Sequence, residues 1–262
     1  MTNPAYPATI DDVLKELEII INNSIKENDR AGYFAALYYK VTQKVKEGIV
    51  RGDFEDGPRM ERLDVCFAGR YLQALEQWKN KNTPTDSWAI AFQQSRRRQP
   101  LLLQHLLLGI NAHINLDLGI AANEIARDSN LFAIQKDFNA INEIIASLIY
   151  EVTNDLMRIS PFLSLFGMHA TNQKSVLIQF SVTNARDGAW VFAQDLHVQK
   201  PESHSSFIAQ RDKDIAALGA ALINVKGLIR VTRWIIHLFE WKNPARINKA
   251  LHEDSRVKIV VG

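Results

Sequence analysis

The fold of this chain is decided by residues 101–127, which follow Pro100 and run "LLLQHLLLGINAHINLDLGIAANEIAR". Apolar residues recur here at spacings of three and four, which predicts one long helix over about residues 100–127, opened by the proline. Polar side chains interrupt the apolar ones on two opposite faces. Apolar residues nevertheless occur on every side of the helix, and a helix that is apolar all round is usually buried. We therefore expect this helix to lie at the centre of the protein, with other helices around it.

The rest of the chain has the same helical spacing, and the alternating pattern typical of strands is scarce. Loops such as "RGDFEDGP" at 51–58 separate the helical segments. Thr83 and Pro84 predict the N-cap and first residue of a fourth helix. Other helices are predicted over about residues 10–27, 30–50, 58–79, 130–157 and 172–198. Three more are predicted near the C-terminus, one beginning at Pro201, one within 227–241 and one after Pro244.

These segments predict an all-α fold in one all-helical domain, residues 1–262, built as a globular bundle of roughly nine or ten helices around the central one. The tail "RVKIVVG" at 256–262 is the exception, because it is strand-like.

Composition limits the classes of function. Of the 262 residues, 47% are hydrophobic and 23% are charged, a balance typical of globular proteins. Cys66 is the single cysteine, which excludes an intramolecular disulfide and every multi-cysteine metal site. The N-terminus has no signal-peptide pattern, and no apolar run reaches the ~18 residues of a membrane span. We therefore expect a cytoplasmic protein without a transmembrane segment.

The net charge is +2, from 31 basic and 29 acidic residues. Proteins that bind nucleic acid usually carry a basic face or stripe, and the dense cluster at 96–98 is more typical of a solvated loop. We therefore expect no nucleic-acid partner. The sequence leaves the oligomeric state open.

The central helix carries the candidate site. His113 and Asp117 are four residues apart, so they share a face and suit a common metal or an aspartate-oriented imidazole. His105 lies on the same face but about 12 Å away along the axis, too far to bind the same ion comfortably. Asn111 and Asn115 lie on the opposite face. Gly109, between the histidines, predicts close approach by a crossing helix or by a ligand.

The third predicted helix offers a partner. Asp64 lies within its apolar arc, between Met60 and Phe67, so its carboxylate must be paired, hydrogen-bonded, metal-bound or protonated. Arg70 lies at the edge of that arc, within reach of a carboxylate on a neighbouring helix. We expect Asp64 and His113 to meet in a solvent-reachable cavity.

Three hypotheses follow. In the first, His113, Asp117 and Asp64 are catalytic in a hydrolase, either as ligands of one divalent metal (zinc, iron or manganese) or as a metal-free acid–base set. In the second, the protein binds an apolar or lipid-like small molecule. In the third, the polar residues form a buried structural network. Further binding residues predicted are His105, Asn111, Asn115, Arg70 and Tyr71.

Two other clusters receive structural interpretations. Arg186 and Asp187, just before Trp190, are interpreted as a core ion pair. The stripe of Arg230, Arg233, His237 and Trp241 is interpreted as a solvated face beside packed aromatic residues.

Four strings carry a family resemblance: "RAGYFAALYYKVT" (30–42), "FEDGPRMERLDVCFAGRYLQAL" (54–75), "QHLLLGINAHINLDLGIAA" (104–122) and "ARDGAWVFA" (185–193). Together they resemble a bacterial family known as domain of unknown function 5995, over about residues 28–195. The resemblance implies a helical protein without an assigned activity, and so assigns no catalytic residue.

A weaker similarity links the central helix to the helical zinc-dependent phospholipase C and S1-type nuclease group, which uses a pattern like His-x-x-Gly-Asp-x-His. The chain departs from that pattern: one residue too many separates His105 from Gly109, and Asn111 stands in place of the aspartate. The N-terminal tryptophan ligand of that group is also missing.

Overall fold

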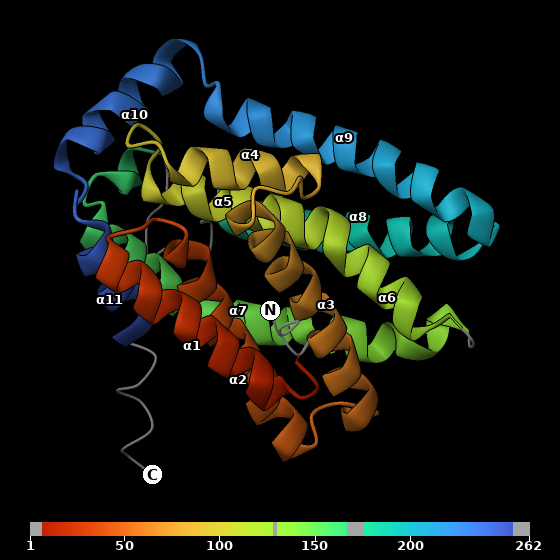
Figure 1. Ribbon diagram of the computed structural model, residues 1–262. Helices are drawn as coiled ribbons and strands as arrows, with labels where there is room; N and C mark the ends of the chain where they lie inside the picture. The colour runs from red at the N-terminus through yellow and green to blue at the C-terminus, as the bar shows by residue number, and fades with distance from the viewer. Residues whose placement is uncertain (1–6, 128–129, 167–175, 254–262) are drawn as a thin grey trace.

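The computed structural model describes residues 7–127, 130–166 and 176–253 (Figure 1). All regular secondary structure in these ranges is helical, as predicted, and none of it is strand. The α-helices are α1 (Ile10–Glu27), α2 (Gly32–Arg51), α3 (Gly57–Lys79), α4 (Asp86–Ser95), α5 (Leu102–Ala112), α6 (Gly119–Ile125), α7 (Gln135–Ile159), α8 (Val176–His197), α9 (His204–Ile223), α10 (Gly227–Phe239) and α11 (Pro244–Glu253).

Shorter helical turns complete the described chain. The π-helical turn η1 (His113–Leu118) joins α5 to α6, and 3₁₀ turns form η2 (Leu131–Ile134), η3 (Leu163–Phe166) and η4 (Pro201–Ser203). Because α5, η1 and α6 form one continuous rod, the eleven labelled α-helices amount to ten helices, which agrees with the predicted nine or ten.

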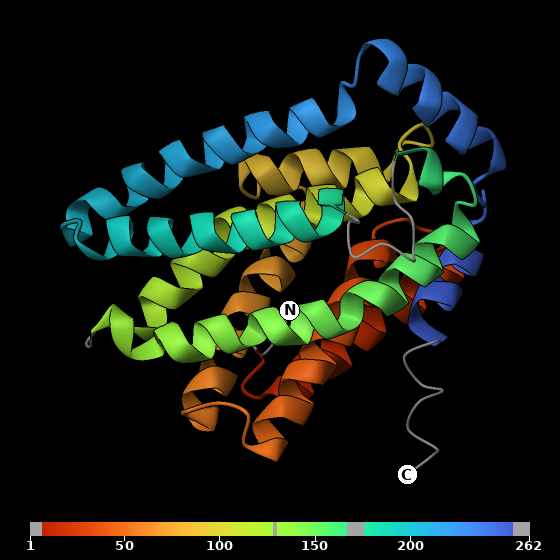
Figure 2. The ribbon, with the colours of Figure 1, turned by 180° about the vertical axis from the view of Figure 1, so that it is seen from behind.

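The rod from α5 to α6 is the centre of the bundle (Figure 1). Helices α2, α4 and α9 contact α5, while α3 and α8 contact η1 and α6. Most side chains between residues 101 and 123 are buried. The prediction of a central buried helix is therefore confirmed, and Figure 2 shows α8 on its other side.

Helix boundaries agree with the sequence wherever a local cap sets them. At the start of α1, the hydroxyl of Thr9 accepts a hydrogen bond from the backbone N–H of Asp12, whose carboxylate accepts one from the Thr9 backbone. The predicted start of the fourth helix at Thr83 and Pro84 is wrong, because α4 begins at Asp86. Its cap comes from Asp212 of α9, which accepts hydrogen bonds from the first two backbone N–H groups of α4 at 2.6 and 3.0 Å.

The central rod also departs from the regular helix that was predicted. The α-helical pattern stops at Ala112, and His113–Leu118 forms a π-helical turn before α6 begins at Gly119. Such turns are rare and occur frequently at functional sites. Angular positions calculated for an ideal α-helix therefore do not hold beyond His113.

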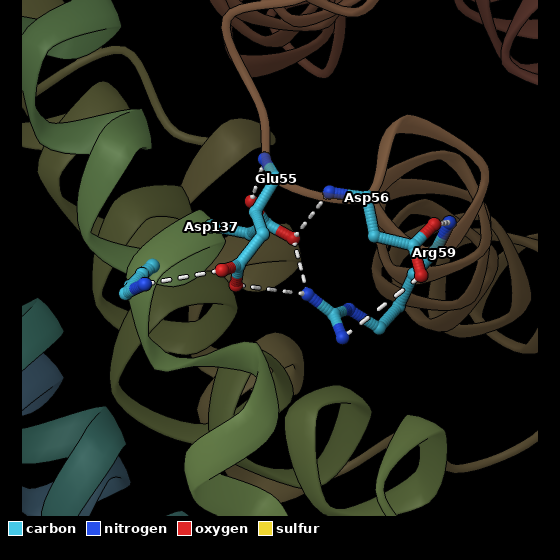
Figure 3. A network of polar contacts seen from close by, with 5 residues as sticks. Glu55, Asp56, Arg59 and Asp137 are labelled. Atoms are coloured by element: carbon cyan, nitrogen blue, oxygen red, sulfur yellow. Dashed lines mark hydrogen bonds and ion pairs between the residues drawn. The ribbon is translucent and has the colours of Figure 1, made fainter.

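The loop between α2 and α3 is fixed to the start of α7 by Asp137 (Figure 3). Its buried carboxylate accepts hydrogen bonds from the backbone N–H of Glu55 at 2.6 Å and of Asp56 at 3.3 Å, and it pairs with Nη2 of Arg59 at 2.6 Å. The acidic stretch "DFEDG" thus lies in a loop with a structural role. This clamp holds α7 against the pair α2–α3.

Helix α10 lies at the edge of the bundle (Figures 1 and 2). Arg230 is exposed, Arg233 and His237 are half-buried, and Arg246 stacks on the half-buried ring of Trp241 at 3.8 Å. The solvated face agrees with the prediction, but the packed aromatic neighbours do not, because Trp234 and Phe239 are 61% and 55% exposed. The predicted strand-like tail and the predicted start of the seventh helix at 172 lie outside the described residues. Of the helices that the structure describes, none is long and apolar enough to span a membrane.

Candidate functional site

Asp117, in the π-helical turn, is the centre of the polar site. Its carboxylate is 1% exposed and accepts hydrogen bonds from three sources. Nε of Arg70 donates to Oδ1 at 2.9 Å, Nε1 of Trp88 donates to Oδ2 at 2.8 Å, and Nδ1 of His113 lies 3.4 Å from the same Oδ2. The Arg70 contact confirms the prediction that this arginine reaches a carboxylate on a neighbouring helix.

His113 is held rigidly beside that carboxylate. Its ring stacks on Phe67 with 3.5 Å between centroids and 6° between planes, and the rings of Phe34 and Tyr38 contact it edge-on. Burial lowers the pKa of His113, and Asp117 opposes this effect. The imidazole is therefore neutral at pH 7.

The tautomer follows from the contact with Asp117. A carboxylate only accepts hydrogen bonds, so Nδ1 carries the proton and Nε2 is a free acceptor. Nε2 of His113 is buried, and no described residue bonds to it.

Like His113, Asp64 has a buried side-chain atom without a hydrogen-bond partner among the described residues. Asp64 lies on α3 and is 4% exposed, and the atom in question is Oδ2. Burial, with a smaller contribution from Glu61, raises the pKa of Asp64 to about 7. The group is therefore only partly ionised at neutral pH, which makes it a proton donor as well as an acceptor.

Asp64 and His113 both line one cavity of about 120 Å³. Its walls come from α2, α3, α5, η1, α7 and α8, and most lining side chains are aliphatic or aromatic. The other polar groups in the lining are Tyr38 and Arg186. Asp64 and His113 therefore line the same cavity, while their direct approach within it stays a prediction.

Several residues predicted to bind a ligand lie elsewhere. Nδ2 of Asn111 donates to the backbone oxygen of Ile215 in α9 at 2.8 Å, and Nδ2 of Asn115 donates to Oδ1 of Asn111 at 3.0 Å. Neither asparagine lines the cavity. Their hydrogen bonds hold them against α9, away from the cavity that His113 lines.

His105 is also separate from the cavity. It packs edge-on against Tyr33, with 5.7 Å between ring centroids, and burial lowers its pKa to about 3. Two turns of α5 separate it from His113, so the two histidines do not share a site. Tyr71 lies closer, with its ring centroid 6.2 Å from that of His113, but it does not line the cavity either.

Gly109 marks the crossing of α5 by α2. A Cβ atom at this position would lie 2.6 Å from Cγ of Phe34. The two explanations left open by the sequence were a crossing helix and a ligand, and the crossing helix is the one observed. The crossing positions Phe34 against His113.

The proposed metal ligands do not converge. In the part of the chain that the structure describes, no group of three or more histidine, cysteine, aspartate or glutamate side chains is arranged to hold a metal ion. Both oxygens of Asp117 already accept hydrogen bonds from Arg70 and Trp88. The predicted set of His113, Asp117 and Asp64 therefore gains no support as a metal centre.

Sequence reasoning missed two residues of the site. Trp88 was not singled out from the sequence, although a buried indole N–H needs an acceptor, and this need was the available signal. Arg186 was assigned to a core ion pair with Asp187, and that interpretation is wrong. Asp187 is exposed, while Nε of Arg186 donates to Oδ1 of Asn142 at 2.5 Å and Nη2 donates to the backbone oxygen of Phe138.

Comparison with known proteins adds a family but no activity. No curated protein and no solved structure matches the chain. A family model described as a family of unknown function, DUF5995, matches residues 10–225. This range includes Asp64, His113, Asp117 and Arg186. The chain therefore belongs to the DUF5995 family.

Proposed function

We propose that the protein binds a small, largely apolar molecule in the cavity beside His113. The observation that carries this proposal is the pair of buried polar atoms, Nε2 of His113 and Oδ2 of Asp64, that no described residue satisfies. A buried polar group without a partner costs about 1–3 kcal/mol. Both residues line a cavity whose walls are mostly apolar, and a ligand with one polar group would relieve that cost.

The size of the cavity sets the size of the ligand. A cavity of about 150 Å³ lined by leucine, isoleucine and phenylalanine accepts benzene, and the cavity here measures about 120 Å³. The ligand, or the part of a longer ligand that enters, is therefore about as large as one substituted ring or a short branched chain. Apolar side chains with a few polar groups are the usual lining of small-molecule sites.

The test uses toluene and benzyl alcohol, two probes of similar shape that differ by one hydroxyl. Isothermal titration calorimetry should show that benzyl alcohol binds, and binds more tightly than toluene, because its hydroxyl reaches a polar group of the cavity. Val152→Phe fills the cavity and should abolish binding of both probes.

The matched control is Val50→Phe, since Val50 is 80% exposed on α2, and this variant should bind like the parent protein. If the folded parent protein binds neither probe, the proposal is wrong. Mass spectrometry of the extracted protein gives a second test, because a co-purifying small molecule should be absent from Val152→Phe.

General base catalysis on the bound molecule is a second candidate function. The observation that favours it is the fixed tautomer of His113, which turns an unprotonated Nε2 into a buried acceptor. Such an imidazole removes a proton from water or from a substrate, and Asp64, with a pKa of about 7, is a suitable proton donor. Ester hydrolysis by the parent protein, lost in His113→Gln while benzyl alcohol binding remains, would support catalysis; no hydrolysis would leave binding alone.

A further inference from the structure

We propose that the ligand of this cavity is an anion, with a carboxylate or a similarly small acidic group bound by the guanidinium of Arg186. The inference rests on the proposed function, and it names the chemical class of the ligand. Arg186 lies on α8, lines the cavity that Asp64 and His113 also line, and is 3% exposed.

The hydrogen-bond partners of Arg186 are all neutral. Its Nε donates to the amide oxygen of Asn142, its Nη2 donates to the backbone oxygen of Phe138, and its Cζ lies 4.5 Å from the centroid of the Phe138 ring. No carboxylate of the described residues lies within 4.0 Å of its guanidinium nitrogens. Asp187, the next residue, is exposed; its charge raises the pKa of Arg186, but the two form no ion pair within 4.0 Å.

Two other basic residues of the interior have counter-charges. Nζ of Lys40, which is also 3% exposed, lies 2.7 Å from Asp155 and 3.0 Å from Glu151. Arg59 pairs with Asp137 (Figure 3). A buried charge without a partner is costly, and buried charges are normally paired. The contrast with Lys40 indicates that the missing counter-charge of Arg186 comes from outside the described chain.

The charge of Arg186 persists under physiological conditions. Burial lowers its pKa to about 10, so the guanidinium is still protonated at pH 7. His113 is neutral, and Asp64 has a pKa of about 7. Below pH 7 the groups that line the cavity therefore carry a net positive charge, and protonated Asp64 is a further donor.

The shape of the guanidinium suits a carboxylate. Arginine has five N–H donors in a planar fork that binds carboxylates through two parallel hydrogen bonds. Two of these donors, on Nε and Nη2, bond to described residues.

The experiment adds benzoate to the toluene and benzyl alcohol probes and measures all three by calorimetry at pH 6, where Asp64 is largely protonated. The parent protein should bind benzoate at least tenfold more tightly than benzyl alcohol. Arg186→Gln should keep the affinity for benzyl alcohol and lose the preference for benzoate, and Arg186→Lys should restore part of it. The matched control is Arg62→Gln, an exposed arginine of α3, which should behave like the parent.

The outcomes separate the inference from the proposed function. Equal binding of benzyl alcohol and benzoate by the parent protein overturns the anion inference and leaves the proposed function standing. Retention of the benzoate preference in Arg186→Gln overturns the role of Arg186. Failure of all three probes overturns both. The comparison within the parent protein requires no variant, so it holds even where Arg186→Gln does not fold.

Discussion

His113 and Asp117 face each other across the π-helical turn of the central rod, with 3.4 Å between Nδ1 and Oδ2. Arg70 of α3 and Trp88 of α4 bind the same carboxylate. The carboxylate therefore links three helical elements and fixes the imidazole beside the cavity. Because the rod contacts most of the bundle, this junction determines both the stability of the core and the orientation of Nε2.

Arg70→Ala should destabilise the protein by about 3 kcal/mol, at the lower end of the range for breaking a buried ion pair, because Arg70 is 25% exposed. Chemical denaturation measures this change. Arg70 also lowers the pKa of His113, so an NMR titration of the variant should show a higher pKa for His113.

The control is Arg62→Ala, on the exposed face of α3, which should change neither quantity. Trp88→Phe should cost about 1–3 kcal/mol through the loss of one donor to a buried carboxylate. A variant Arg70→Ala as stable as the parent protein would show that the carboxylate of Asp117 does not depend on this pair.

Helical spacing was sufficient to predict most of the fold. The predicted bounds of the first and third helices agree with α1 and α3 to within one residue, because their caps are local in sequence. The burial of Asp64 was predictable for the same reason, since its position in the apolar arc of α3 determines which way it faces. The start of α4 was not predictable, because its cap is Asp212, which lies more than a hundred residues further along the chain.

The site was predicted less completely than the fold. An ideal helical wheel places His113 and Asp117 on one face, but it contains no signal for the π-helical turn that holds them. The acceptor for Trp88 and the neutral partners of Arg186 depend on how distant helices pack, and spacing within one helix says nothing of that. Charge patterns suggested Asp187 as the partner of Arg186, although consecutive residues of a helix face different directions.

Asp64→Asn should change how stability depends on pH. The folded-state pKa of Asp64 is raised from 3.8 to about 7, so the folded state holds a proton that the unfolded state releases. The parent protein therefore loses stability from this group as the pH rises from about 4 to 7. At pH 8 the variant should be more stable than the parent by at most about 4 kcal/mol, and at pH 4 the difference should vanish.

Thermal denaturation between pH 4 and pH 8 measures this effect, with Asp195→Asn, an exposed aspartate of α8, as the control. Parallel pH profiles for the parent protein and Asp64→Asn would contradict a raised pKa for Asp64.

His105→Gln should act in the opposite direction. Burial lowers the folded-state pKa of His105 to about 3, so below pH 6.5 the unfolded state binds a proton that the folded state excludes. The contribution of His105 to the free energy of unfolding is therefore fully present above pH 6.5 and is lost as the pH falls. The loss between pH 7 and pH 5 is about 2 kcal/mol. The variant should lose less stability over that interval than the parent protein.

The control for His105 is His204→Gln, at the start of α9, which should keep the acid sensitivity of the parent protein. An equal loss of stability in His105→Gln and the parent between pH 7 and pH 5 would show that His105 is not the source.

Gly109→Ala tests whether the crossing of α2 and α5 is as close as described. Alanine favours a helix over glycine by about 1 kcal/mol, but here its Cβ would overlap the ring of Phe34. Overpacking of this kind costs about 1–3 kcal/mol, so we expect a net loss of stability in denaturant unfolding. Gly188→Ala in α8 is the matched control, because its Cβ has room, with the nearest atom at 3.6 Å.

The control should therefore be as stable as the parent protein or more stable. In a double-mutant cycle, Phe34→Ala should remove the penalty of Gly109→Ala, so that the two changes together cost less than their sum. Additive costs would mean that the loss at Gly109 does not arise from Phe34. Because Phe34 also contacts His113, the same cycle measured with benzyl alcohol reports whether this crossing sets the shape of the cavity.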